Sequence, residues 1–410
     1  SERLYLSSVG PVVGWLDVEV YKQTGDAQAA QGWCPMIVDT NGDGQMNELD
    51  TFWNDGEGWE PIGWSSSNAF TGDFHGNGHQ IRNLYIDRRG NAGLFGYIQG
   101  TADQIAVITE LAITGSMTYS TSTNNSSGIL ATTVSYAEIS SVFVSGLVRA
   151  NLHAGGLAGI AYDTSLHSVF SSTSILSGKY QGGLISSIKD GMISSSLSTG
   201  YVDMGGGALG ISIRENTHRN LYWAKDVSSQ PESAGTNSTY FGAHLNELQC
   251  PTSANDSACT DEGILFENWD TEDWDFGTNR QLPGLILGDR IYRDSDGDGA
   301  LDEEDAYPDT FAASLDTDTD GYPDRFTLGC DASCRNDSGL TLDAFPLSAE
   351  AYLDTDLDGL VDEWAEGCGT TCQANSGLTL DDYPDDRDND GISDAVDTDD
   401  NNDGIIDADA

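Results

Sequence analysis

Basic residues and long apolar runs are both scarce in this chain. Only 17 Lys and Arg stand against 67 Asp and Glu, which gives a formal net charge of −50 over 410 residues. A field of this sign repels nucleic acid and anionic membranes and attracts cations. The shortage of Lys and Arg also weighs against a lyase-type catalytic site. No apolar run approaches the ~20 residues of a membrane-spanning helix.

Motifs of common hydrolases are missing as well. No Gly-x-Ser-x-Gly nucleophile elbow occurs. His75 and His79 are separated by Gly-Asn-Gly, and these glycines oppose the helix that would place both rings on one face, so a turn is favoured over a zinc site. The chain starts at Ser1 without a signal peptide, which we interpret as a mature form or a removed leader.

Cysteine is used sparingly and mostly in local pairs. None of the seven cysteines has neighbouring His or Cys residues at zinc-site spacing, so disulfides are favoured over metal ligation. Disulfides in turn indicate secretion. Cys34 is left over, either as a buried free thiol or in a bridge to another chain. The expected pairs are Cys250 with Cys259, Cys330 with Cys334, and Cys368 with Cys372.

A glycine-containing pattern recurs between Phe70 and Gly210. The apolar residue after the glycine marks each repeat, and successive markers are 35, 28, 27 and 24 residues apart. A quasi-period of 20–50 residues is typical of stacked-coil folds, and short alternating runs such as Ser141–Val148 favour strands. Such strands cannot bury an apolar face alone, so coil must stack on coil. The markers are Leu94, Ile129, Leu157, Leu184 and Ala208.

The predicted fold is therefore all-β, a right-handed parallel β-solenoid. Both ends of residues 59–290 resemble a GLUG-motif region, a kind found in bacterial surface adhesins and beside the protease domain of immunoglobulin A peptidases. The resemblance implies a parallel β-helix but no single chemistry. The peptidase's metal motif, two His flanking Glu on a helix, is absent, so that activity is not implied. The segments that carry the resemblance to a GLUG-motif region are Trp59–Gly63, Phe70–Ile81, Asn83–Ile86, Gly93–Gly96, Trp274–Gly277 and Gln281–Leu285.

Two aspartates are the strongest catalytic candidates in the solenoid. Asp163 and Asp190 each follow a marker by six residues, one coil apart. Stacked coils would hold them ~5 Å apart, near the carboxylate separation of a retaining glycosidase. Their sequence contexts are typical of turns, however, and Arg214 falls at the same offset in the next coil. The turn interpretation is favoured, and no catalytic residue is predicted.

Residues 211–290 mix aromatic and acidic side chains without a clear period. Trp269, Trp274 and Phe276 are either an exposed sugar-binding surface or a cover over the last coil. The cover is favoured, because open solenoid ends need protection.

An acidic loop in the first 58 residues has the spacing of a hard-cation site. Oxygen-bearing side chains occupy loop positions 1, 3, 5, 9 and 12, with Gly44 at position 6 to make the sharp turn and Gln45 offering its carbonyl. The loop resembles a single EF-hand loop, closest to the dockerin kind. The expected ligands are Asp39, Asn41, Asp43, Gln45, Asn47 and Asp50.

The composition changes abruptly after Arg293. From Asp294 onward, 35 Asp and Glu face 3 Lys and Arg, and five loops follow the pattern Asp-x-Asp/Asn-x-Asp-Gly-x-x-Asp. The recurrence predicts several Ca²⁺ ions. The run is similar to thrombospondin type-3 repeats, which wrap chain around calcium with almost no hydrophobic core. The loops contain Asp294, Asp296, Asp298 and Asp302 (loop one), Asp316, Asp318, Asp320 and Asp324 (loop two), Asp354, Asp356, Asp358 and Asp362 (loop three), Asp386, Asp388, Asp390 and Asp394 (loop four), and Asp399, Asn401, Asp403 and Asp407 (loop five).

Position 12 separates two kinds of loop. In loops one and four it is Asp305 and Asp397, but in loops two and three it falls on residues that offer no carboxylate, and a Cys-x-x-x-Cys segment follows. Removing 16 residues from each of these segments would bring Asp343 and Asp381 into position 12. We therefore expect each disulfide segment to loop out, so that the distant aspartate returns to its ion.

Three segments are predicted: residues 1–58 with one calcium loop, a solenoid with its cover over 59–290, and calcium repeats over 291–410. The predicted function is that of a secreted or surface-displayed structural or adhesive protein without catalysis. Its expected partners are calcium ions and either further copies in a filament or a glycan or protein of a cell surface or matrix. The rivals are a carbohydrate-active β-helix enzyme and a non-catalytic module of a larger peptidase.

Overall fold

The computed structural model describes residues 57–121, 125–213, 217–233, 240–249, 265–266, 269–278, 281–397 and 399. The chain divides into two compact units, residues 1–311 and 312–410. The acidic loop one therefore belongs to the first unit. The domain limits at 58/59 and 290/291 stay predictions.

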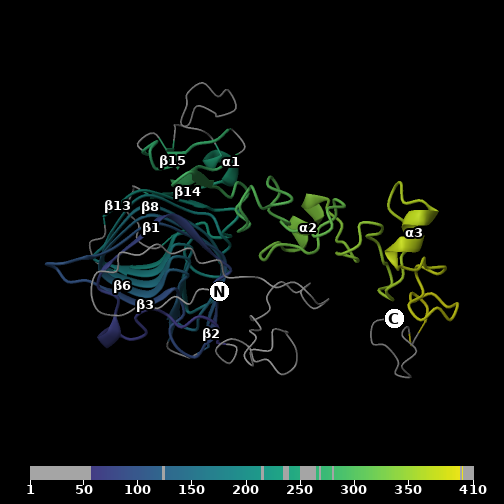
Figure 1. Ribbon diagram of the computed structural model, residues 1–410, viewed down its shortest axis with the longest axis horizontal. Helices are drawn as coiled ribbons and strands as arrows, with labels where there is room; N and C mark the ends of the chain where they lie inside the picture. The colour runs from purple at the N-terminus through teal and green to yellow at the C-terminus, as the bar shows by residue number, and fades with distance from the viewer. Residues whose placement is uncertain are drawn as a thin grey trace. The chain divides into compact units, whose positions relative to one another are not determined.

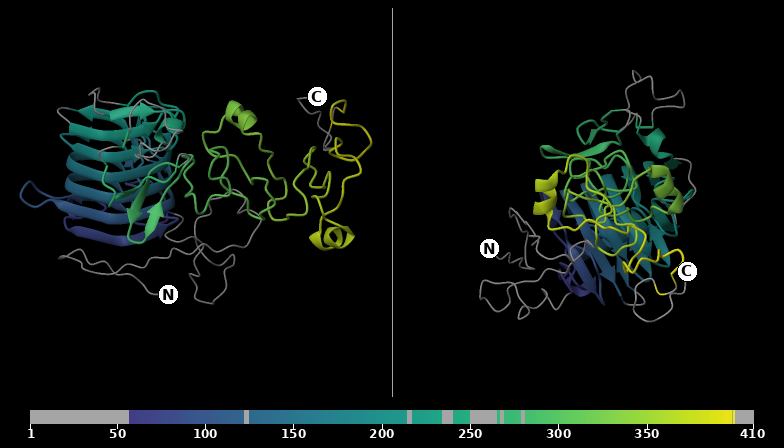
Figure 2. Two further views of the ribbon diagram at one scale, coloured as in Figure 1. Left: turned by 90° about the horizontal axis from the view of Figure 1, so that it is seen from above. Right: turned by 90° about the vertical axis from the view of Figure 1, so that its right-hand side faces the viewer.

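The first unit is a parallel β-solenoid, which confirms the predicted fold class (Figures 1 and 2). Its principal sheet stacks strands from successive coils, all paired in parallel. Along the main path the order is β1 (Asp73–Arg82), β4 (Ala106–Ser120), β6 (Ala131–Arg149), β8 (Ala158–Ser177), β11 (Met192–Ser198), β13 (Thr217–Ala224) and β14 (Tyr240–Ala243). Beside this path lie β2 (Tyr85–Arg88), β3 (Phe95–Gln99), β10 (Ile185–Lys189) and β12 (Leu209–Ile213).

A smaller parallel sheet carries the glycine motifs. It pairs β5 (Ser126–Ser127), β7 (His153–Gly155) and β9 (Tyr180–Gly182). Gly155 and Gly182 stack in this sheet, and a Cβ on either would lie within 2.2 Å of a backbone carbonyl oxygen. The motif therefore has glycine where the chain bends too tightly for a side chain, and the apolar residue after it enters the core.

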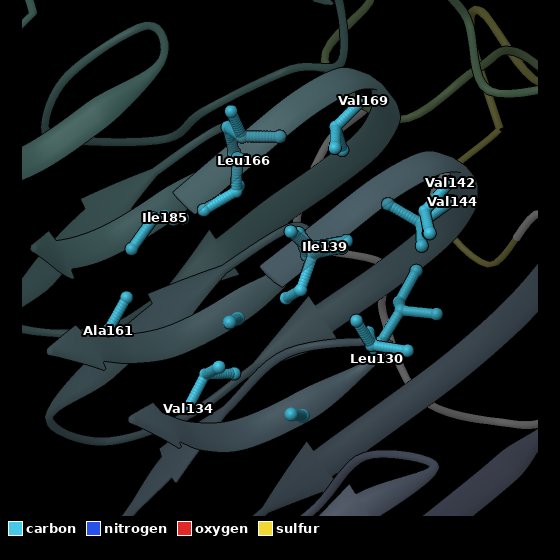
Figure 3. Packing of buried hydrophobic residues seen from close by; sticks show 14 of the residues in the cluster. Leu130, Val134, Ile139, Val142, Val144, Ala161, Leu166, Val169 and Ile185 are labelled. Carbon is cyan, nitrogen blue, oxygen red and sulfur yellow. The ribbon is translucent and has the colours of Figure 1, made fainter. Parts of the chain in front are cut away.

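Columns of apolar side chains run through the solenoid and are completely buried. Ala131 pairs with Ala158 and Ala158 with Ile185, so the preceding leucines Leu130, Leu157 and Leu184 share one column. The second predicted marker was wrong by one residue. The second coil has one residue more than the first before Ala131, since Ala92 pairs with Ser127 but Phe95 pairs with Ala131, and Leu130, not Ile129, therefore lines up with Leu157. Figure 3 shows the packing of buried residues that include Leu130, Val134, Ile139, Val142, Val144, Ala161, Leu166, Val169 and Ile185.

Residues with positive φ turn the long strands around the solenoid corners. One corner has Ser141, Ser168 and Ser195 in successive coils, with φ between 46° and 52°. The left-handed residue reverses the alternation of the strand, since Ile139 before Ser141 and Val142 after it both enter the core. A second corner has Tyr136, Asp163 and Asp190.

An antiparallel sheet covers one outer flank of the solenoid. It consists of β15 (Trp274–Asp275), β16 (Gly284–Leu287) and β17 (Arg290–Tyr292). It packs on a column of outward-facing apolar side chains from five coils, and Trp269 and Trp274 are buried there. These tryptophans therefore cover a flank, where the sequence predicted a cover over the last coil. The column is Ala112, Phe143, Phe170, Leu197 and Tyr222.

The second unit has little regular structure. Its helices are α2 (Ala332–Ser338) and α3 (Thr370–Ser376), and Val361 forms an isolated bridge with Leu380. Elsewhere, η3 (Ser66–Asn68) and α1 (Leu245–Leu248) are single turns of the first unit. Within the described ranges, no helix has the length and apolarity needed to cross a bilayer.

Candidate metal centres

Four groups of three aspartates converge in the described part of the chain. In each group one carboxylate oxygen per residue lies within 4.8 Å of the other two. All four groups occupy positions 1, 3 and 5 of a predicted loop. The groups are Asp294, Asp296 and Asp298; Asp316, Asp318 and Asp320; Asp354, Asp356 and Asp358; and Asp386, Asp388 and Asp390.

Backbone amides fix the direction of these carboxylates, as loop two illustrates. Oδ2 of Asp316 accepts a hydrogen bond from the Gly321 amide at 2.9 Å, across the turn that the positive φ of Gly321 permits. Oδ1 of Asp318 accepts from the Asp320 amide at 3.2 Å, and Oδ1 of Asp320 accepts from the Tyr322 amide at 2.8 Å. Oδ1 of Asp316 also accepts from the Thr319 amide at 2.7 Å, so the loop backbone uses both oxygens of Asp316 and one oxygen each of Asp318 and Asp320.

Six of the carboxylate oxygens in the triplets are buried without a hydrogen-bond partner. Across the groups this holds for one oxygen each of Asp296, Asp318, Asp320, Asp354, Asp386 and Asp388. A buried, unpartnered carboxylate oxygen is costly unless a cation faces it. Convergent carboxylate oxygens are the donors that a hard divalent cation takes. The donor set therefore fits a metal ion at each group.

Burial and mutual repulsion act on the pKa of these acids. Burial, followed by repulsion from Asp298, raises the pKa of Asp296 to about 10 and that of Asp294 well above its usual range. Burial raises the pKa of Asp343 to about 7. A cation would reverse this balance, because it favours the ionised form.

Asp343 and Asp381, the aspartates predicted for position 12, have surroundings that can be compared with those of the uninterrupted loop one. Asp343 interacts electrostatically with the carboxylates of loop two, and Asp381 with those of loop three. Both accept a bond through Oδ1 from the amide two residues on, at 2.7 Å, as Asp305 does in loop one. Oδ2 of Asp343 and of Asp381 is buried and has no hydrogen-bond partner. The distant aspartates therefore take the conformation of the uninterrupted loop, and their role as ligands stays a prediction.

Short disulfide-closed helices form the inserted segments. Cys330 bonds to Cys334 and Cys368 to Cys372, as the sequence predicts. The Asp331 side chain caps α2 by accepting from the Cys334 amide at 2.9 Å. Glycines with positive φ end both helices. The insertion thus folds on itself and returns the chain toward its loop.

The aspartates at position 9 of the loops accept hydrogen bonds that hold the loop backbone in place. Asp302 accepts bonds from the amide and hydroxyl of Ser295 at 2.6 and 2.7 Å, and Asp324 accepts the corresponding pair from Thr317 at 2.9 and 2.6 Å. Asp362 accepts the same pair of bonds from Thr355, and Asp394 accepts one from the Arg387 amide at 2.9 Å. These four residues lie outside the oxygen triplets, so their role as ligands stays a prediction while their bracing role is clear.

Neighbouring loops of the second unit also join one another. The Asp386 amide donates to Oδ2 of Asp356 at 3.0 Å, and the Asn389 side chain donates to Oδ2 of Asp358 at 2.8 Å. The rings of Tyr322 and Tyr352 stack with centroids 3.6 Å apart. Loops three and four therefore form one continuous acidic cluster.

Several predicted residues lie outside the described part of the chain. These are the N-terminal loop (Asp39, Asn41, Asp43, Gln45, Asn47 and Asp50), the predicted pair Cys250 and Cys259, the left-over Cys34, and Asn401, Asp403 and Asp407 of loop five. Asp397 and Asp399 are described, and Asp397 accepts a hydrogen bond from the Asp399 amide at 3.0 Å. The rest stay predictions.

The catalytic candidates of the sequence lie at bends. Asp163 and Asp190 occupy a solenoid corner with φ of 46° and 54°, in keeping with the turn interpretation. His75 and His79 flank an irregularity of β1, where Asn77 and Gly78 have positive φ. The segment is a bent strand and not the helix that a paired histidine site would use.

One constellation was missed by the sequence reasoning. Nδ1 of His167 lies 2.9 Å from Oγ of Ser194, and Nε2 lies 3.3 Å from Oδ2 of Asp273. Asp273 also accepts from the Ser168 hydroxyl at 2.6 Å, and its hydrogen bond to His167 raises the pKa of that histidine. His167 lies in β8, Ser194 in β11, and Asp273 directly before β15. His167 and Asp273 are 106 residues apart in the sequence, so no local motif could reveal the group.

Comparisons with known proteins find no matching family model. Over 111 residues, 26% of the chain, the sequence is 39% identical to Halomucin from Haloquadratum walsbyi. That stretch spans about 1% of the length of Halomucin. Among solved structures, one described as an immunoglobulin A1 protease from Bacteroides ovatus is 18% identical, covers 56% of this chain and 81% of its own, and has a TM-score of 0.38.

Proposed function

We propose that this chain is a non-catalytic structural or adhesive protein of a cell surface or matrix, and that calcium rigidifies its acidic loops. The observation that carries the proposal is the repeated oxygen triplet with buried, unpartnered oxygens. Four such groups at one spacing suit calcium, which accepts many oxygen ligands in flexible geometry, better than magnesium. The similarity of one segment to Halomucin supports a place at the cell surface.

Calcium in the repeats has a mechanical consequence. The second unit presents many carboxylates and little apolar core, so its ordering follows from cation–oxygen contacts. The solenoid is rigid by its stacked columns. A rigid coil joined to calcium-ordered repeats is the design of a stalk or filament component. The GLUG-type and thrombospondin type-3-like assignments are part of this proposal.

Titration and imaging of the full chain test the proposal. Isothermal titration calorimetry should show binding of at least four calcium ions, one for each described triplet. Electron micrographs with calcium and with chelator should show extended monomers or fibres that change with calcium. Absence of calcium binding at millimolar concentration would contradict the proposal.

The His167 constellation favours a second candidate function, a hydrolase. A serine, a histidine and an aspartate in hydrogen-bond reach are the parts of a nucleophile and its base. Against this, Ser194 lies in β11 of the solenoid sheet, and its hydroxyl also donates to the Leu166 carbonyl at 3.4 Å. The hydroxyl therefore has a structural partner. We expect no turnover of polysaccharide, ester or peptide panels. Turnover that Ser194→Ala abolishes would establish the hydrolase, and turnover that Asp163→Asn or Asp190→Asn abolishes would favour a glycosidase.

A further inference from the structure

Loop one differs from the other acidic loops in its surroundings. It belongs to the solenoid unit, whereas loops two to four lie in the second unit. Asp294, Asp296 and Asp298 are only 1%, 2% and 8% exposed. Little solvent therefore reaches the three converging carboxylates, and one oxygen of Asp296 has no hydrogen-bond partner.

The loop contacts three successive coils of the solenoid. The Ser172 hydroxyl on β8 donates a hydrogen bond to Oδ2 of Asp294. Thr199, directly after β11, donates to Oγ of Ser172 at 3.2 Å. Gly297 packs against Thr199 and against Val227, which follows β13. The first position of the loop is thus tied to one coil and its turn rests on the next two.

Gly297 is the residue that permits this approach. It occupies position 4 of the loop with φ of +82°, where the other described loops have Thr319, Leu357 and Asn389 in the same left-handed region. A Cβ on Gly297 would lie 2.9 Å from Cγ1 of Val227 and 3.2 Å from the Thr199 carbonyl oxygen. A side chain is tolerated in the other loops and excluded here, because the solenoid lies directly against the backbone.

Further contacts hold both sides of the loop. The Gln249 side chain donates to the Ser295 carbonyl at 2.8 Å. After the triplet, Glu304 pairs with Arg82 of β1 at 2.8 Å and Glu303 pairs with Arg290 of β17. Leu301 is 2% exposed in the apolar flank cluster. Loop one is therefore built into the solenoid flank.

We propose that loop one binds calcium as a buried ion that fastens the flank to the coils of β8, β11 and β13, with Ser172 positioning Asp294. This inference rests on the proposed function, because it takes the ion to be calcium. It adds that calcium stabilises the solenoid and does not act on the acidic repeats alone. Bound calcium draws the three carboxylates together, and the chain on either side can then leave the solenoid only with a loss of ligands.

Hydrogen–deuterium exchange of the full chain, in calcium and in chelator, tests the inference. Peptides from β8, β11 and β13 should exchange about tenfold more slowly when free calcium is ten times the dissociation constant, because only the closed state binds the ion. Asp296→Asn should remove this protection and leave calcium-dependent protection of residues 316–397. The matched variant Asp318→Asn should remove calcium-dependent protection around loop two, residues 316–324, and leave the protection of β8, β11 and β13 unchanged.

Two further variants separate the ion from the packing. Gly297→Thr keeps every carboxylate but introduces the residue of loop two, so it should remove calcium protection of β11 and β13 even if Asp296→Asn fails to fold. Ser172→Ala should move the calcium midpoint of flank protection to higher concentration and leave the midpoint of residues 316–397 unchanged. Equal midpoints for wild type and Ser172→Ala would refute the positioning role.

The outcomes distinguish the inference from the proposed function. If calcium protects residues 316–397 but leaves exchange in β8, β11 and β13 unchanged, the fastening ion is refuted and the proposed function stands. If calcium protects neither region, the proposed function itself fails.

Discussion

The solenoid and the second unit are ordered by different means. The solenoid buries large apolar side chains in every coil, such as Phe95, Phe143 and Phe170, each fully enclosed. Among the described residues after Phe311, the buried apolar side chains are small ones: Ala312, Ala313, Cys330, Ala351 and Val361. The second unit buries carboxylates instead, including Asp343, Asp356, Asp381 and Asp386.

This difference shows which forces each region requires. Burial of apolar area favours folding in any ionic condition, so the solenoid's columns act without a ligand. Buried carboxylates oppose folding unless a cation compensates their repulsion and lost hydration. Loop one combines the two situations, because its carboxylates are buried against the solenoid itself.

The largest expected effect is a loss of solenoid stability that leaves the acidic loops of the second unit unchanged. Phe170→Ala removes a fully buried ring that contacts Phe143 and Trp274, at a cost of about 3–5 kcal/mol in the free energy of unfolding. Urea denaturation followed by circular dichroism measures the loss. Leu347→Ala, at a side chain that is 75% exposed, is the matched control and should change little. A comparable loss in both variants would contradict the account of the core.

Removal of a single carboxylate should weaken calcium binding in the repeats and leave the solenoid unchanged. Asp343→Asn removes one negative oxygen donor from loop two, so we expect calcium there to bind at least tenfold more weakly, about 1.4 kcal/mol. Calorimetric titration gives the affinity. Asp337→Asn, on the exposed surface of α2, is the control and should leave it unchanged. An unaltered affinity in Asp343→Asn would show that the inserted segment does not return a ligand.

The smallest expected effect concerns the flank sheet and pH. The hydrogen bond to Asp273 raises the pKa of His167 above 6.5, and the bond from His167 lowers the pKa of Asp273 below 3.8. The histidine's contribution is therefore complete below pH 6.5 and lost as pH rises through its folded pKa, while the aspartate's is complete above pH 3.8 and lost as pH falls through its folded pKa. The contact is strongest between these limits.

Exchange of the β15 amides at pH 5.5 and 8, corrected for the intrinsic rate, measures this contact. His167→Gln should remove the difference, which will be small because the ring is half exposed and water screens the pair. A pH difference that persists in the variant would assign the effect to another group.

Much of the fold follows from local sequence. The glycine motifs recur because tight bends at Gly155 and Gly182 exclude a side chain, and this periodicity predicted the coils. The register did not follow as fully, since one extra residue before Ala131 displaced the second marker from Ile129 to Leu130. Spacing alone cannot reveal such a slip.

The candidate sites divide in the same way. The loop spacing placed Asp294, Asp316, Asp354 and Asp386 in convergent groups because position 1, 3 and 5 geometry is local. Alignment of the repeats predicts Asp343 and Asp381 as further ligands, and one oxygen of each is buried without a hydrogen-bond partner. Sequence could not show that Ser172 contacts Asp294, 122 residues away, or that the ninth-position aspartates brace the backbone. The contact with Ser172 depends on the packing of distant segments. The brace is local, over seven residues, but the spacing alone does not tell whether such an aspartate faces an ion or the backbone.

The central claim is that calcium orders the second unit while apolar packing orders the solenoid. Limited proteolysis of the full chain with and without chelator, with cut sites mapped by mass spectrometry, tests it most directly. Chelation should open cut sites throughout residues 312–397. The solenoid strands from β1 to β13 should stay resistant, because loss of the loop-one ion speeds local exchange in β8, β11 and β13 without unfolding the apolar core. A chelated second unit as resistant as the calcium-loaded one, or a solenoid degraded along with it, would contradict the account.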